Sequence, residues 1–137
     1  MPVAKEQGFV LLESLVAGLA LLVMAACFAL FARSMELEVA DGCRVRAIFL
    51  ARTQFAAAQA DASESRLHAG SYPWQGEAED LQDGRASYTV QTHINGAGDG
   101  EAGSGIYKVS VHVAWHGEAA RGQLDLEREV VEHGRRE

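Results

Sequence analysis

The stretch Gly8-Phe9-Val10-Leu11-Leu12-Glu13 opens an apolar run that continues without another charge from residue 14 to residue 32. At about 1.5 Å per residue, a helix over residues 9–32 is ~36 Å long, which exceeds the ~30 Å hydrocarbon core of a bilayer. The run therefore predicts a transmembrane helix. Glu13 lies inside it, and a charge in hydrocarbon costs roughly 2.5–3.5 kcal/mol on insertion scales, so this carboxylate predicts a specific partner.

Two kinds of export signal compete with a retained membrane helix. A cleaved secretory signal has a shorter apolar core, of about 7–15 residues, without an acid in it. A lipoprotein signal is suggested by Met24-Ala25-Ala26-Cys27, with Cys27 as the lipidated residue, but the chain stays apolar after this cysteine. Both alternatives fit the sequence less well than a membrane helix.

The charges that flank the run predict its orientation. Lys5 and the free amine precede it, offset by Glu6, whereas Arg33 follows it and is outweighed by nearby acids. The positive-inside rule then favours, on a small difference, a cytoplasmic N-terminus and places the rest of the chain across the membrane.

Gly8-Phe9, the glutamate four residues after Phe9 and the long apolar helix resemble the N-terminal signature of type IV pilins and type II secretion pseudopilins. In that family a prepilin peptidase removes a leader that ends in glycine, the new N-terminal residue is methylated, and the glutamate is needed for assembly. The resemblance implies a leader at residues 1–8, cleavage between Gly8 and Phe9, N-methylation of Phe9 and an assembly role for Glu13. It also implies a single-pass protein of the bacterial inner membrane with a periplasmic C-terminal domain.

Physical chemistry points to the partner of Glu13. Cleavage leaves a positive amine on Phe9 at the membrane edge, and a buried carboxylate is tolerable only when it is paired. The amine of a neighbouring subunit is a suitable partner, and the amine of the same helix, one turn away, is another. A glutamate that merely extends to the headgroups is the third possibility. Val10 and Glu6 depart from the family pattern, but neither touches the residues on which the resemblance depends.

Small residues recur four positions apart in the apolar run, at Ser14 and Gly18 and again at Ala25 and Ala29. This spacing permits close helix packing in membranes, although an alanine-rich composition produces it as well. Sibling helices are the expected neighbours.

Residues 33–66 predict an amphipathic stem helix, because apolar residues recur at helical spacing among arginines; they are Val45, Ile48, Phe49, Phe55 and Ala56. No proline interrupts the run or the stem, so we expect one continuous helix that ends between residues 63 and 68.

Residues 67–133 predict a small antiparallel sheet domain, followed by a polar tail at residues 134–137. Strand patterns occupy residues 87–94, 106–115 and 123–131, and glycine-rich segments between them predict hairpins. Residues 69–84 are expected to form a loop. So small a domain has a thin core, and the apolar face of the stem is expected to form one wall of it. The predicted fold class is α+β: a pilin-like long N-terminal helix packed on a small antiparallel sheet.

Candidate catalytic and metal-binding groups are few. The five histidines lack metal-ligand spacing, and no glycine-flanked serine nucleophile is present. Residues 95–101 offer oxygen ligands for calcium without the spacing of a recognised calcium loop. Cys27 and Cys43 would lie ~24 Å apart on one helix, too far for a disulfide. We therefore expect no enzyme activity, no cofactor and no metal.

The net charge of −7 makes nucleic acid an unfavourable partner. Within the family, the short chain, the proline-free stem and Leu50-Ala51-Arg52-Thr53-Gln54-Phe55-Ala56 resemble minor pseudopilins of the I type, although Thr53 departs from their common Asn-Gln pair. That resemblance implies a subunit near the pseudopilus tip, which joins other minor and major pseudopilins to initiate assembly and drive folded proteins across the outer membrane. The alternatives are a minor type IV pilus pilin, a lipoprotein or single-span binding module, and a membrane-tethered enzyme.

Overall fold

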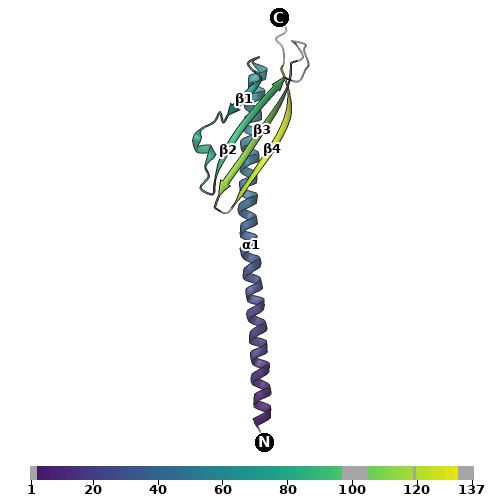
Figure 1. Cartoon of the computed structure of the whole chain (residues 1–137), viewed down its shortest axis with the longest axis vertical. Coiled ribbons are helices and arrows are strands. Elements are labelled where there is room, and N and C mark those ends of the chain that lie inside the picture. The colour runs from purple at the N-terminus through teal and green to yellow at the C-terminus, as the bar shows by residue number, and fades with distance from the viewer. Residues whose placement is uncertain (1–2, 97–104, 119, 133–137) are drawn as a thin grey trace. The chain divides into compact units, whose positions relative to one another are not determined.

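The structure is a computed structural model that describes residues 3–96, 105–118 and 120–132 (Figure 1). Its elements in chain order are α1 (Val3–Ser63), β1 (Gly70–Pro73), the single-turn helix η1 (Ala78–Leu81), β2 (Ala86–Gly96), β3 (Ile106–Gly117) and β4 (Arg121–Val131). One long N-terminal helix and a four-stranded antiparallel sheet make the fold α+β, as predicted. The chain divides into two compact units, Met1–Glu38 and Val39–Glu137.

The first unit contains the apolar part of α1. Residues 9–32 are helical throughout and their side chains are exposed. By length and composition alone, α1 qualifies as a membrane span.

In the second unit, the stem part of α1 packs on the sheet through a face of mostly small side chains. Its buried members are Cys43, Ala47, Leu50, Ala51, Gln54, Phe55, Ala58 and Ala62. The predicted apolar face was wrong for Val45, Phe49 and Ala56, which are exposed. The inner face of the sheet supplies most of the large side chains of this core, so close packing places mostly small helix side chains against it, with Leu50 and Phe55 as the large exceptions.

The stem ends in a cap that uses one left-handed residue. Ser65 has a φ of 55°, and the Arg66 amide donates to the carbonyl of Asp61 at 2.8 Å. This 6→1 bond is that of a Schellman motif. The end of the helix at Ser63 lies inside the expected range.

The sheet is a meander with the strand order β1-β2-β3-β4, and every neighbouring pair is antiparallel. β3 is central, and its inward side chains Val109, Val111 and Val113 are fully buried. On β2, buried Tyr88, Val90, Thr92 and Ile94 alternate with exposed residues along the strand. The three predicted strands therefore match β2, β3 and β4 to within about two residues, the usual uncertainty of element ends.

β1 and η1 correct the expectation of a plain loop at residues 69–84. β1 pairs with β2, with Tyr72 opposite Thr92. A four-residue strand that ends in Pro73 is too short to show an alternating pattern, so only its pairing with β2 identifies it.

Candidate functional site

The predicted processing and assembly residues lie at the start of the apolar part of α1. Phe9 and Glu13 are four residues apart, so they share one face of the helix, and both side chains are exposed. Gly8 is helical as well, and a Cβ built on it would meet nothing within 4 Å. The structure therefore places Phe9 and Glu13 on one accessible face of the helix.

The four small residues share a second face of the same helix. At about 100° per residue, Ser14, Gly18, Ala25 and Ala29 fall within about 60° around the helix axis. Glu13 lies about 100° or more from each of them, so the carboxylate and the small residues point to different sides. Ser14 Oγ donates to the Leu11 carbonyl at 2.9 Å, which satisfies its hydroxyl within the helix. This face is thus compact and needs no polar partner.

A buried polar pair that the sequence analysis missed joins the stem to the sheet. Thr92 Oγ1 donates to Gln54 Oε1 at 3.2 Å, and each residue is only 3% exposed. An unpaired polar group at such a site costs about 1–3 kcal/mol, so the bond favours one register of α1 on β2. The available signal was the position of Gln54, three and four residues from apolar Ala51 and Ala58.

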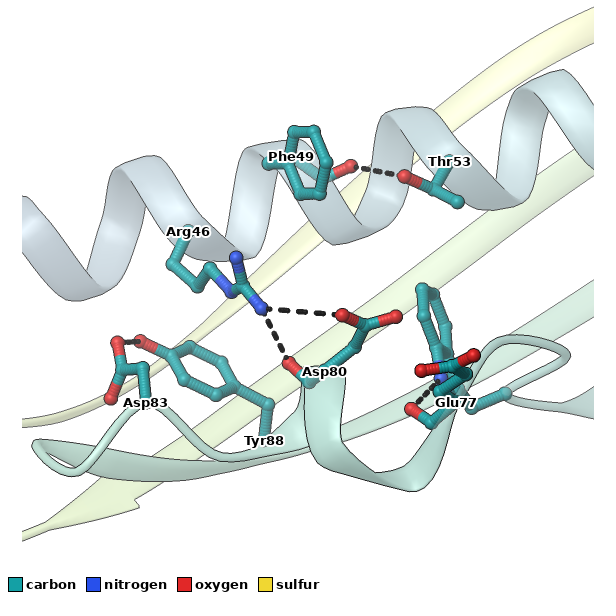
Figure 2. Close-up of polar contacts among 8 residues, drawn as sticks. Arg46, Phe49, Thr53, Glu77, Asp80, Asp83 and Tyr88 are labelled. Atoms are coloured by element: carbon teal, nitrogen blue, oxygen red, sulfur yellow. Dashed lines mark hydrogen bonds and ion pairs between the residues drawn. The ribbon is translucent and has the colours of Figure 1, made fainter.

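Arg46 ties η1 to the stem, as Figure 2 shows. Its Nη2 donates to the Asp80 carbonyl at 3.0 Å and lies 3.7 Å from Asp80 Oδ1. The guanidinium also lies 5.5 Å from the centre of the Phe49 ring. Arg46 Nε is buried and has no hydrogen-bond partner within the described part of the chain. The arrangement holds the acidic segment before β2 against the helix.

Asp83 organises the turn that leads into β2. Its Oδ1 accepts the amides of Arg85 and Ala86 at 2.9 and 3.0 Å. Its Oδ2 accepts the Tyr88 hydroxyl at 3.0 Å, as Figure 2 shows. Burial raises the pKa of Asp83, but these hydrogen bonds outweigh it and keep the pKa below its ordinary value. Burial, together with Cys43 and Asp83, raises the pKa of Tyr88. The carboxylate is therefore charged and the phenol neutral at pH 7, which suits a structural hydrogen bond.

Three histidines on the strands each contact a different neighbour. The contacts are Ser71 Oγ to His93 Nδ1 at 2.7 Å, His112 Nδ1 to Asp125 Oδ1 at 2.5 Å, and Arg121 Nε to His116 Nδ1 at 2.9 Å. Over residues 3–96, 105–118 and 120–132, no three His, Cys, Asp or Glu side chains are grouped so that they could hold a metal ion.

The remaining candidates are less informative. His68 is exposed, and its carbonyl accepts the hydroxyl of Tyr72 at 2.9 Å. His133 and most of the loop at residues 95–101 lie outside the described residues. Cys27 and Cys43 are both free thiols, the first exposed and the second buried.

Comparison of the chain with protein-family models, with curated proteins and with solved structures gives no match.

Proposed function

We propose that this chain is a minor pseudopilin of a type II secretion system, a structural subunit near the tip of the pseudopilus. It helps to initiate assembly and to drive folded proteins across the outer membrane. The observation that carries the proposal is Glu13, a carboxylate inside an apolar helix, four residues after Phe9 and five after Gly8. A long N-terminal helix with a small antiparallel sheet is compatible with a pilin-like fold.

In this proposal a prepilin peptidase cuts between Gly8 and Phe9, and the new amine of Phe9 is methylated. The helix crosses the inner membrane, with its N-terminus in the cytoplasm and the sheet domain in the periplasm. The amine then carries a positive charge at the membrane edge, and Glu13 of a neighbouring subunit neutralises it. This ion pair sets the axial position of one helix against the next.

The two faces of the apolar helix support a subunit with more than one neighbour. Glu13 offers a charged contact on one side, and the face of Ser14, Gly18, Ala25 and Ala29 offers a close-packed contact on another. A filament needs such non-equivalent contacts, because its subunits associate head to tail without closure. The expected partners are other minor and major pseudopilins.

The processed N-terminus tests the proposal. Co-expression with a prepilin peptidase, followed by intact mass measurement, should show the loss of residues 1–8 and the gain of one methyl group. Gly8→Leu should abolish this loss, while Gly18→Leu, the same change inside the apolar run, should leave it intact. A lipid on Cys27 would identify a lipoprotein instead, and an untrimmed chain would identify a plain anchor. Co-purification with pilus rather than secretion subunits would favour a minor type IV pilin.

A further inference from the structure

β4 is the long, open edge of the sheet. The strand order places it at one end, and each of its residues from Arg121 to Val131 pairs with β3 on the other side (Figure 1). Among the described residues no strand pairs with its outer edge. At the opposite edge, β1 has four residues and ends in Pro73. An edge of 11 residues without proline is a template on which another chain can add a strand.

A groove runs beside this edge, between the stem and β4. It has a volume of about 420 Å³ and is lined by Gln59 and Ser63 of the helix and by residues 128–131 of the strand. Side chains alternate between the two faces of a strand, so every second side chain of an added strand would enter the groove. Arg128 belongs to the inward row, opposite Val109, yet it is exposed there. The groove therefore accommodates a polar or acidic side chain rather than an apolar one.

Three successive outward-facing residues of β4 are acidic. Asp125, Glu127 and Glu129 are all exposed. Lys108 of β3 lies 2.8 Å from Glu127, and its hydrogen bond and charge lower the pKa of that carboxyl. His112 contacts Asp125. Because the three carboxylates outnumber Lys108 and Arg121, the row keeps a net negative charge, and it favours lysine or arginine on the strand that comes to lie beside the acids.

The same charges disfavour several pairings of β4 with β4 of a second copy of this chain. An antiparallel pairing of two β4 strands centred on Leu126 sets Asp125 opposite Glu127 twice. A pairing centred on Arg128 sets this arginine opposite itself, and a parallel in-register pairing opposes every like charge. Like charges directly opposite on adjacent strands are destabilising. These three pairings of two β4 strands are thus disfavoured, whereas an added strand with basic residues beside the acids is favoured.

We propose that the edge of β4 binds an extended segment of a different protein as a fifth strand. This segment carries Lys or Arg at alternate positions, opposite Asp125, Glu127 and Glu129, and Glu or Gln at the position opposite Arg128. Backbone hydrogen bonds supply the attachment, and the alternating charges supply the selectivity. The inference concerns the sheet domain and is independent of the function proposed for the apolar helix.

Peptide binding to the full chain in uncharged detergent micelles tests the inference. A fluorescent peptide with the core Lys-Glu-Lys-Val-Lys should bind, as measured by anisotropy. An isomer with the core Lys-Lys-Lys-Glu-Val, and a form N-methylated at alternate amides, should bind at least about tenfold more weakly. The double variant Glu127→Lys/Glu129→Lys should lose the preference for the alternating peptide. The matched variant Glu77→Lys/Glu79→Lys, with the same change of charge away from β4, should keep it.

Four outcomes would overturn the inference. They are equal affinity for the two isomers, insensitivity to N-methylation, an equal loss in the Glu77/Glu79 variant, and no binding up to about 1 mM peptide. Circular dichroism of each variant establishes that the fold is retained. Sedimentation of the peptide-free chain adds a further check. If the chain dimerises as its concentration rises, and Glu127→Lys/Glu129→Lys changes this dimerisation, the edge of β4 binds a second copy instead.

Discussion

Gln54 and Thr92 are the two polar residues buried in the described core, and each satisfies the other. Apolar core side chains surround most of the pair, and a pocket of about 40 Å³ that Asp61, Arg66 and His68 also line adjoins it. The pair therefore penalises any shift of α1 along β2 more strongly than apolar contacts do, since apolar contacts tolerate small displacements.

Thr92→Val removes the hydroxyl at nearly constant volume and leaves Gln54 Oε1 without its donor. We expect the free energy of unfolding to fall by about 1–3 kcal/mol. The double variant Gln54→Leu/Thr92→Val should cost less than the sum of the two single changes, because no polar group is left unpaired. Urea unfolding in micelles, followed by the fluorescence of buried Trp115, measures the cycle. Strict additivity would show that the two residues do not stabilise each other.

For single residues, the sequence indicates that Glu13 needs a specific partner, but it does not indicate the Gln54–Thr92 hydrogen bond. Glu13 is an anomaly against its immediate neighbours, so a local pattern reveals it. The bond joins residues 38 positions apart, and nothing near Thr92 in the sequence distinguishes it from an ordinary strand threonine. Its existence depends on which face of the stem meets the sheet, which is a tertiary property.

The elements themselves follow largely from local patterns. β2 and β3 alternate between apolar and polar residues, β4 does so except at Arg128, and the absence of proline predicts the continuous helix. The face of the stem that meets the sheet was harder to predict. Bulky Val45 and Phe49 suggest one face, whereas the alanines at positions 47, 51, 58 and 62 lie in the core. Hydrophobicity ranks the large residues first, whereas packing against a sheet of valines and aromatics selects by volume.

Ala47→Leu tests this assignment of the stem face. Ala47 is fully buried against the sheet, so the added carbons must displace well-packed neighbours, and we expect a loss of about 1–3 kcal/mol in unfolding free energy. Ala56→Leu makes the same chemical change on the exposed side of the helix and should stay within about 0.5 kcal/mol of the parent. Chemical denaturation of the two variants side by side gives the comparison, and a reversed order would place Ala56 in the core.

For the whole molecule, the order of elements predicts the fold class: one apolar helix, an amphipathic continuation and then strands give an α+β layout. β1 has no signal of its own in the sequence, because a strand of four residues depends on its partner rather than on an alternating pattern. The function proposed for the chain rests on the N-terminal residues, and its decisive test therefore lies there.

Glu13→Ala should leave processing at Gly8-Phe9 intact but reduce incorporation into a pseudopilus by about a hundredfold or more. Removing one partner of a buried ion pair costs about 3–5 kcal/mol, because the Phe9 amine is left without its counter-charge. Co-purification with the other pseudopilins, together with the intact mass, separates assembly from cleavage.

Two matched variants make that comparison specific. Glu13→Gln keeps the shape without the charge and should fail as Glu13→Ala does. Glu36→Ala removes an exposed acid of α1 outside the apolar run and should assemble normally. Normal assembly of Glu13→Ala would refute the role proposed for this residue.

The meander order of the sheet has a consequence for how the chain acquires its structure. Every strand pairs with the strand next in sequence, so the sheet has a low contact order for a β-structure. Each pairing closes only a short loop, which costs little conformational entropy. Each hairpin can form from two neighbouring segments without a distant strand in place. β4 is the last strand of the chain, so the strand that leaves an open edge is also the one that completes the sheet.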